Sequence, residues 1–135
     1  MRRFLAVALT AATFASTACG GGDSIGPNSV TGTYTLQSVN GAGLPAAILE
    51  DASYKLEVLS GSYTLSSNNT YSATASFKET DNGVVTPTTQ FETGTYTLHG
   101  SSVTFTDSDD FQTDGTISGS DLTISAGGLT VRYSR

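Results

Sequence analysis

Apolar and polar residues alternate with a period of two along most of the chain after residue 30, and no sustained helical period interrupts them. The sequence YSATASF, for example, puts Tyr71, Ala73, Ala75 and Phe77 on one face of an extended segment. Successive side chains of a β-strand point to opposite faces, so the pattern predicts strands with one buried face. The chain is therefore predicted to be all-β.

Short turn signals separate the alternating segments. They are found at Asn68-Asn69, Asp81-Asn82-Gly83, His99-Gly100, the polar stretch Asp107-Ser108-Asp109-Asp110, Gly119-Ser120 and Ala126-Gly127-Gly128. Short connections of this kind join antiparallel neighbours, and the segments add up to about eight strands in up-and-down order. Eight strands can close into a barrel that has no free edges, and an open two-layer sandwich is the alternative.

Two segments depart from simple hairpins. The apolar phase of 54–58 is opposite to that of 63–65, which predicts a bulge or break near 59–61. The connection 40–51 is longer than the others, and its stretch 46–52 has the composition of a single helical turn.

The N-terminus has the layout of a signal peptide. A basic head, Arg2-Arg3, precedes an uncharged apolar segment at 4–15 and small residues up to Cys19. The apolar segment is shorter than the about 20 residues that a transmembrane helix needs. Ser16-Thr17-Ala18-Cys19 resembles a bacterial lipobox, in which the cysteine thiol takes a diacylglycerol. The resemblance implies cleavage before Cys19 and attachment of lipid to it.

This interpretation divides the chain into a lipoprotein signal peptide (1–18), a lipidated cysteine with a flexible tether (19–29) and a β-barrel domain (30–135). In some Gram-negative bacteria an Asp after the cysteine marks retention in the inner membrane. Gly20 occupies that position here, so the resemblance favours the outer membrane of the cell envelope. Cleavage by an ordinary signal peptidase would instead release a soluble protein with a free Cys19.

Charge argues against nucleic acid as a partner. The full chain carries a formal net charge of −6, and removal of Arg2 and Arg3 with the signal peptide makes it two units more negative. Phosphate backbones repel such a surface.

Catalytic and metal-binding residue patterns are weak. The single histidine, His99, lies in a predicted turn without a recognisable nucleophile or orienting carboxylate. The acidic segment 107–115 begins like a calcium-binding loop, but Phe111 occupies the third ligand position and Gln112 the glycine position. Alternation instead places Phe111 and Ile117 on one strand face. We expect no catalytic residue, no metal and no cofactor.

Gly32-Thr33-Tyr34 on the first strand, followed by a longer first loop and a chain of hairpins, resembles a small lipocalin-like domain. The lipocalin signature is Gly-X-Trp, with an arginine near the last strand that packs over the tryptophan. Tyr34 stands at the tryptophan position, and Arg132 or Arg135 at the arginine position. Arg135 shares the alternation phase of Tyr133, and Arg132 does not. The resemblance covers about residues 30–135 and implies a non-enzymatic barrel that acts by binding.

A ligand inside such a barrel would contact the inward side chains. The residues assigned to the interior are Tyr34, Leu36, Tyr71, Ala73, Ala75, Phe77, Phe105 and Tyr133. The small Ala73 and Ala75 predict a gap near the third strand. The predicted partners are the membrane, through lipid on Cys19, and a small hydrophobic ligand. The alternative function is a structural or interaction module of the envelope that uses its polar β surface.

Overall fold

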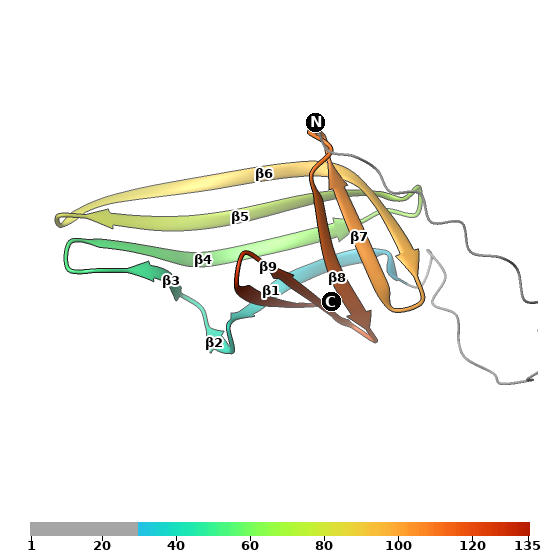
Figure 1. Cartoon of the computed structure of the whole chain (residues 1–135), viewed down its shortest axis with the longest axis horizontal. Helices are drawn as coiled ribbons and strands as arrows, with labels where there is room; N and C mark the ends of the chain where they lie inside the picture. The colour runs from blue at the N-terminus through green and yellow to red at the C-terminus, as the bar shows by residue number, and fades with distance from the viewer. Residues whose placement is uncertain (1–29) are drawn as a thin grey trace, which may run out of the picture.

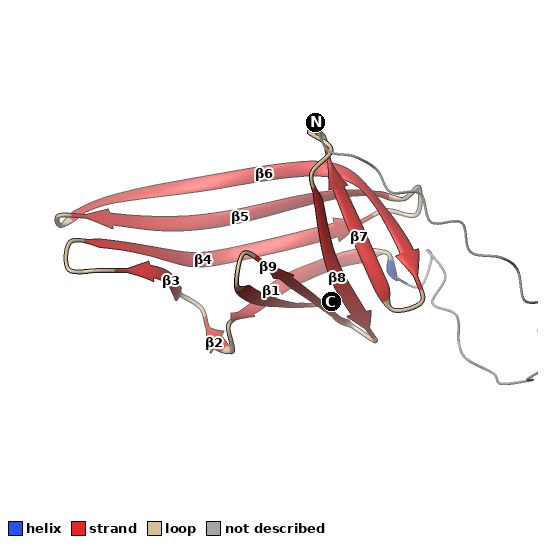
Figure 2. Ribbon diagram, viewed as in Figure 1, coloured by secondary structure: helices blue, strands red, loops and turns tan. Residues whose placement is uncertain are grey.

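A computed structural model of the chain describes residues 30–135 and contains ten strands in that range (Figure 1). They are β1 (Gly32–Val39), β2 (Ala42–Gly43), β3 (Ala46–Glu50), β4 (Tyr54–Leu65), β5 (Thr70–Asp81), β6 (Val84–His99), β7 (Ser102–Asp107), β8 (Gln112–Ser118), β9 (Asp121–Ala126) and β10 (Leu129–Ser134). Strands dominate the ribbon (Figure 2), which confirms the all-β prediction. The predicted signal peptide (1–18), the tether (19–29) and Cys19 lie outside the described residues. Over 30–135, no helix has the length and apolarity to cross a bilayer.

Eight of the ten strands close into a barrel. β1 pairs antiparallel with β10, where Leu36 lies opposite Tyr133, and with β4, where Tyr34 lies opposite Tyr63. The strands from β4 to β10 pair with one another in sequence order. Because β1 forms ladders on both of its edges, the sheet closes on itself. The prediction of an eight-stranded up-and-down barrel is therefore confirmed, and the open sandwich is wrong.

The barrel wall is much taller on one side than on the other. β4 and β5 have 12 residues each and β6 has 16, whereas β7 to β10 have six or seven. β1 pairs only with the Ser62–Leu65 end of β4, and beyond that point β3 takes its place, with Ala46 opposite Val58. The long strands continue past the barrel, to the left in Figure 1. We call this part, formed by β3 and the adjoining halves of β4, β5 and β6, the projecting sheet.

The segment 46–50 is strand β3, so the helical turn predicted there is wrong. β3 forms a hairpin with the following strand β4, and this pairing supplies backbone hydrogen bonds along one edge and leaves Ala46 only 3% exposed. A single helical turn would have to be nucleated without cooperative extension. Pairing within the hairpin therefore outweighs the helical preference of the segment.

Phe111 also differs from its prediction, because it lies in the β7–β8 turn and is 76% exposed, whereas Ile117 is 1% exposed. The Oδ1 atom of Asp107 accepts hydrogen bonds from the backbone N–H groups of Asp109 (2.8 Å) and Phe111 (2.9 Å). The turn closed by this carboxylate ends before β8 begins at Gln112. Because β8 begins after Phe111, the alternation predicted for Phe111 and Ile117 does not include Phe111.

Local features read from the sequence are confirmed. The pairing of β4 with β5 shifts register between Val58 and Ser60, which is the bulge predicted near 59–61. Asn82 (φ 46°) and Gly83 (φ 83°) form a two-residue turn between the paired residues Asp81 and Val84. Both turn residues have positive φ, as the hairpin turn of this type requires.

The core lies inside the barrel. Its buried hydrophobic residues are Val30, Tyr34, Leu36, Val39, Ala46, Val58, Leu65, Tyr71, Tyr96, Val103, Phe105, Ile117, Leu122, Ile124 and Tyr133. At the end opposite the projecting sheet, the hydroxyl of Tyr34 donates to the carbonyl of Val30 (2.8 Å) and that of Tyr96 donates to the carbonyl of Ser66 (2.7 Å). Both phenols are thus buried without an unsatisfied polar atom.

Candidate ligand site at the barrel mouth

The middle of the barrel is filled by packed aromatic rings. The centroid of the Tyr63 ring lies 5.0 Å from that of Phe105, 5.2 Å from that of Tyr133 and 5.7 Å from that of Tyr71. Phe105 and Tyr71 meet edge to face, with centroids 4.9 Å apart. Such spacings are those of favourable aromatic pairs. The rings fill the middle of the barrel, so a ligand has to be held at an end of the barrel and not at its centre.

A pocket of about 130 Å³ lies at this mouth, where the barrel meets the projecting sheet. We call it the mouth pocket; it is lined by Tyr63, Ala73, Thr74, Ala75, Gln90, Phe91, Glu92 and Tyr133. The two alanines of β5, the third strand of the barrel, leave the gap that their size predicts. The volume corresponds to about four water molecules and is smaller than the about 300 Å³ at which ligand pockets usually begin. The pocket therefore fits a small group or one end of a longer molecule.

A second hollow, of about 170 Å³, continues from the mouth pocket along the projecting sheet. We call it the trough; it is lined by Tyr54, Leu56, Phe77, Glu79, Thr88 and Gln90. Gln90 lines both hollows, so the two adjoin. The trough lies on the face of the sheet that continues the barrel interior, because Phe77 alternates in phase with Ala75 and Ala73.

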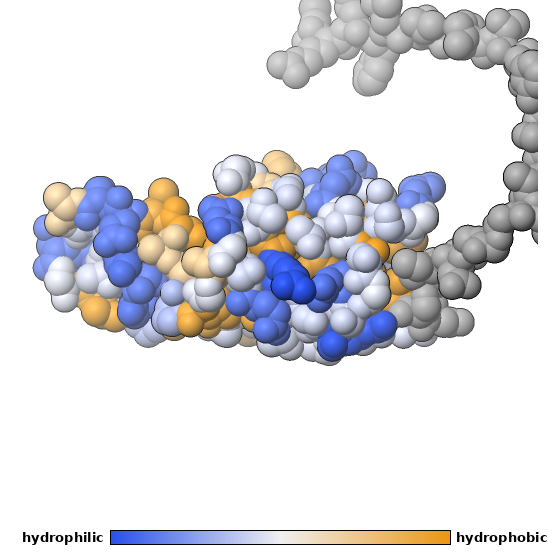
Figure 3. Space-filling view, turned by 90° about the horizontal axis from the view of Figure 1, so that it is seen from below, coloured by the Kyte–Doolittle hydropathy of each residue, from blue (hydrophilic) through white to orange (hydrophobic). Residues whose placement is uncertain are grey.

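The opposite face of the projecting sheet is charged. The carboxylate of Glu57 accepts from Lys78 (2.6 Å) and from Lys55 (3.3 Å), and these contacts lower the pKa of Glu57. On the side of the molecule drawn in Figure 3, apolar surface is broken into small patches separated by polar residues. The face with Leu56 and Phe77 also carries Glu79, so it offers an apolar chain contacts beside one acidic side chain.

Two larger hollows lie on the outer surface. One, of about 470 Å³, is lined by residues at the tips of the projecting hairpins, including Asp51 and Asn82. The other, of about 500 Å³, lies over β7, β8 and β9, where the Thr104 hydroxyl donates to Asp114 (2.7 Å). Both are wide, open depressions with several hydrophilic lining residues. The mouth pocket is smaller, but most of its lining residues, including Tyr63, Ala73 and Tyr133, face inward, which makes it the better candidate site.

The structure divides the predicted interior residues into three groups. Tyr34, Leu36, Tyr71 and Phe105 are at most 5% exposed and pack in the core without lining the mouth pocket or the trough. Ala73, Ala75 and Tyr133 line the mouth pocket, and Phe77 lies beyond the rim in the trough. An interior of eight strands is just wide enough for side chains to fill it, so the bulky residues pack against one another and only the alanines leave space.

Tyr63, Gln90 and Glu92 also line the mouth pocket, although the sequence did not single them out. Glu92 is in phase with the buried Tyr96 on the same strand, so alternation alone points it inward. The bulge in β4 shifts the alternation by one residue, and this shift turns Tyr63 to the same inward face as Val58. The alternation in β6 and the phase change in β4 are both visible in the sequence. Glu92 was not assigned to the inward face because charged residues are not normally placed in a barrel interior.

Glu92 faces the tyrosines of the aromatic cluster. Its Oε1 atom accepts a hydrogen bond from the hydroxyl of Tyr71. Burial, followed by this hydrogen bond and the nearby negative charge, raises the pKa of Tyr71 above its usual value. Burial, followed by the charge of Glu92, also raises the pKa of Tyr133 to about 12, and the pKa of Tyr63 is raised, chiefly by burial. These phenols therefore stay protonated at neutral pH, and those of Tyr63 and Tyr133 are available as hydrogen-bond donors in the pocket lining.

The raised pKa values predict loss of stability at high pH. Below pH 10, the usual tyrosine pKa, folded and unfolded chains hold the same phenol protons. Between pH 10 and about 12 the unfolded chain loses a proton that folded Tyr133 keeps, so the free energy of unfolding falls as the pH rises. We expect urea midpoints to drop across this range, and to drop less in Tyr133→Phe. Ultraviolet titration of the folded protein in which every tyrosine ionises near pH 10 would contradict this.

Arg135 covers Tyr34 at the end of the barrel opposite the projecting sheet. Its guanidinium carbon lies 5.3 Å from the centroid of the Tyr34 ring, and its Nη1 atom donates to the carbonyl of Thr31 (2.6 Å). Gly32 makes room for this side chain, since a Cβ atom there would lie 2.9 Å from Arg135 Cδ. The guanidinium therefore contacts both the Tyr34 ring and the residue that precedes the Gly32-Thr33-Tyr34 motif.

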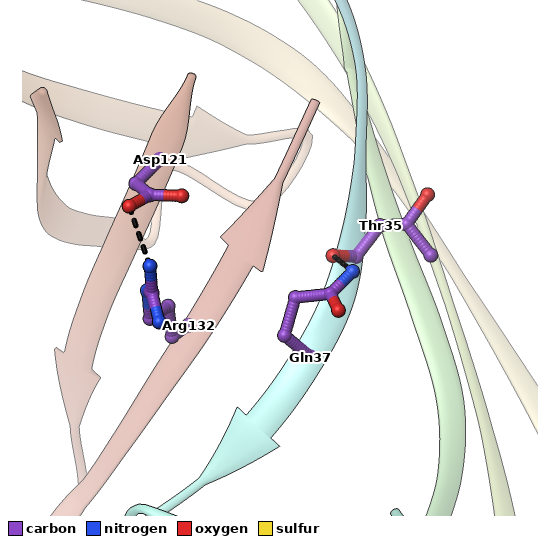
Figure 4. Close-up of polar contacts among 4 residues, drawn as sticks. All are labelled: Thr35, Gln37, Asp121 and Arg132. Atoms are coloured by element: carbon purple, nitrogen blue, oxygen red, sulfur yellow. Dashed lines mark hydrogen bonds and ion pairs between the residues drawn. The ribbon is translucent and has the colours of Figure 1, made fainter. Parts of the chain in front are cut away.

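Arg132 points elsewhere. Figure 4 shows it directed to Asp121 on the neighbouring β9, with Nη2 2.7 Å from Oδ2. In the same view the Gln37 amide donates to the carbonyl of Thr35 (3.1 Å) on β1, next to the register shift where β1 meets β10. Of the two arginines, Arg135 therefore takes the position over Tyr34, as the alternation phase predicts.

Comparison with known protein families matches residues 30–131 to the lipocalin-like domain. The chain belongs to the lipocalin-like family. The match begins just before β1 and ends within β10, so it covers nearly the whole barrel of this lipocalin-like domain and confirms the resemblance seen in Gly32-Thr33-Tyr34. Comparisons with curated proteins and with solved structures gave no match.

The two arginines of the lipocalin-like domain should differ in their effect on stability. We expect Arg135→Ala to lower the free energy of unfolding by about 1–2 kcal/mol, because it removes a cation–π contact and a charged hydrogen bond. Arg132→Ala removes only an exposed ion pair and should cost less than about 1 kcal/mol. Urea unfolding of both variants measures the difference. Equal losses would show that the contact over Tyr34 contributes no more than a surface pair.

Proposed function

We propose that this lipocalin-like domain is a non-enzymatic binding domain of the bacterial cell envelope. It takes the end of a small hydrophobic ligand into the mouth pocket and is tethered to the membrane, most simply the outer membrane, through lipid on Cys19. The observation that carries the binding proposal is the pocket formed where Ala73 and Ala75 face Tyr63 and Tyr133, continued by the trough over the projecting sheet.

The packed aromatic rings and the small volume of the mouth pocket determine how a ligand can bind. The aromatic cluster below the pocket is held by contacts among Tyr63, Tyr71, Phe105 and Tyr133. A ligand would therefore bind against rings that are already in place. A volume of about 130 Å³ excludes a whole lipid from the pocket itself. Most of the ligand would lie in the trough, which is partly open to water, and the affinity should be modest.

The proposal contains no catalytic step. His99 ends β6 and pairs with Ser102 at the β6–β7 turn, and neither residue lines the mouth pocket. The groups at the pocket are a carboxylate, an amide and tyrosines that stay protonated at neutral pH, which orient a ligand through hydrogen bonds.

A steric block of the pocket tests the binding proposal. We expect an environment-sensitive apolar dye to bind the protein saturably, and Ala75→Phe to weaken binding at least tenfold because the ring fills the gap. Ser76→Phe is the matched control, since Ser76 is adjacent on β5 but points to the opposite face, where its hydroxyl meets that of Thr89 (3.3 Å). Unchanged binding in Ala75→Phe, or equal weakening in both variants, would place the dye outside the mouth pocket.

One observation favours the alternative function, a structural or interaction module of the envelope. All ten residues of β6 from Val84 to Thr93 are exposed, and within residues 30–135 this stretch pairs with β5 on one edge only. Val84, Val85 and Phe91 are 66%, 56% and 79% exposed. Absence of saturable dye binding by the wild-type protein would favour this alternative over the ligand-binding proposal.

A further inference from the structure

Glu92 is the one charged side chain among the residues that line the mouth pocket. It comes from β6, opposite Ala73 of β5, and it is exposed at the rim. Within residues 30–135 it has no cationic partner: the ion pairs there join Glu57 to Lys55 and Lys78, and Asp121 to Arg132. The hydroxyl of Tyr71 donates to one of its oxygens. The pocket thus presents an uncompensated carboxylate to whatever enters.

The surroundings of this carboxylate are aromatic. Tyr63 and Tyr133 line the same pocket, and their rings meet edge to face with centroids 5.2 Å apart. A cation beside tyrosine rings is attracted by their negative faces, and the attraction grows when water is partly excluded. An anion in this place would be repelled by Glu92, and a neutral hydroxyl group would gain only a hydrogen bond. The chemistry of the pocket therefore distinguishes ligand heads by charge.

The trough supplies apolar surface and a further carboxylate. Leu56 and Phe77 lie along it with Glu79, which also favours a cationic ligand over an anionic one, and Gln90 joins it to the mouth pocket. A head group placed at Glu92 leaves a short alkyl chain in contact with these side chains, which removes apolar area from water. A ligand that satisfies both parts has a cationic end and an apolar chain.

We propose that the barrel mouth selects amphipathic amines, with the ammonium group between the Glu92 carboxylate and the rings of Tyr63 and Tyr133, and the alkyl chain over Leu56 and Phe77. This inference rests on the ligand-binding function proposed above and names its ligand class. It requires no covalent chemistry, since the ammonium is held by charge, by cation–π contact and by hydrogen bonds.

Three probes that share one alkyl chain test the selectivity: n-hexylamine, 1-hexanol and hexanoate, titrated calorimetrically into the protein at neutral pH. An alkylamine is protonated there, as a lysine side chain is. We expect the amine to bind at least tenfold more tightly than the alcohol, and hexanoate to bind most weakly. Added salt should weaken binding of the amine and leave that of the alcohol unchanged.

Charge variants at the rim identify the group responsible. Glu92→Gln should reduce amine affinity at least tenfold and affect alcohol affinity much less, because the amide still forms a hydrogen bond with a hydroxyl group but carries no charge. Glu50→Gln is the matched control, because Glu50 is exposed on β3 and lines neither hollow, and it should bind like the wild type. Gln90→Lys introduces a cation at an exposed lining position, so it should abolish amine binding and improve binding of hexanoate even if Glu92→Gln folds poorly.

The outcomes separate this inference from the function on which it rests. If the alcohol binds as tightly as the amine, or if Glu92→Gln and Gln90→Lys both keep the preference for the amine, the amine assignment is overturned while ligand binding stands. If none of the three probes binds and the apolar dye also fails to bind, the ligand-binding function itself is wrong.

Discussion

Gly94→Val should destabilise the barrel by at least about 3 kcal/mol, an unusually large effect for one substitution. Gly94 lies where β6 leaves the projecting sheet and enters the barrel, opposite Tyr71 on β5 and Asp107 on β7. A Cβ atom at this position would lie 2.0 Å from the carbonyl oxygen of Thr106 and 2.9 Å from the Cα atom of Asp107. Both are backbone atoms, so no side-chain rotation relieves the overlap and β7 has to move away from β6.

Thermal unfolding followed by circular dichroism measures this effect. A loss of about 3 kcal/mol corresponds to a fall in Tm of about 12–24 °C for a domain of this size, and it is a large share of the 5–15 kcal/mol by which domains are normally stable. Gly43→Val is the matched control, because a Cβ atom at Gly43 in β2 meets nothing within 4 Å. A Gly94→Val protein that melts within a few degrees of Gly43→Val would show that β6 and β7 are not packed as closely as described.

Cys19→Ala should move the protein almost completely from the membrane fraction to the soluble fraction. The expectation follows from the resemblance of Ser16-Thr17-Ala18-Cys19 to a lipobox and from the proposed acylation of the cysteine. Two or more acyl chains anchor a protein stably, whereas one chain binds only marginally. Removal of the thiol to which the diacylglycerol would be attached should therefore remove the anchor and leave the barrel intact.

Fractionation of cells followed by mass spectrometry of the purified protein measures this. The wild-type protein should carry acyl mass on Cys19, and Ser24→Ala, a substitution in the same tether, should remain in the membrane fraction. A wild-type protein with an intact N-terminus and a free thiol would contradict the proposed anchor. This result would leave the ligand-binding proposal untouched, because no residue of the mouth pocket lies in the tether.

The features that depend on local interactions could be predicted from the sequence. The alternation of Tyr71, Ala73, Ala75 and Phe77 places these residues on the inward face of β5, because side chains of a strand alternate whatever its neighbours are. The turn at Asn82 and Gly83 was predicted because positive φ favours these residue types. The phase argument also selected Arg135 over Arg132 as the partner of Tyr34.

The same reasoning was less successful for the candidate site. It placed Ala73, Ala75 and Tyr133 at the pocket but also assigned Tyr34 and Leu36 to it, and these pack in the core. Alternation gives the face to which a side chain points and not the depth at which it lies in the barrel. Depth depends on the stagger of strands that are distant in the sequence.

The sequence by itself determined the strand content, the turns, the bulge in β4 and the inward phase of most core residues, because each depends on neighbours within one hairpin. Only the tertiary structure decided that β1 closes the barrel against both β4 and β10, and that β4, β5 and β6 project beyond the rim. It also brought Tyr63, Glu92 and Tyr133 together from three strands. These outcomes depend on the register between segments far apart in the chain, which is fixed by the packing of the whole interior and not by local preference.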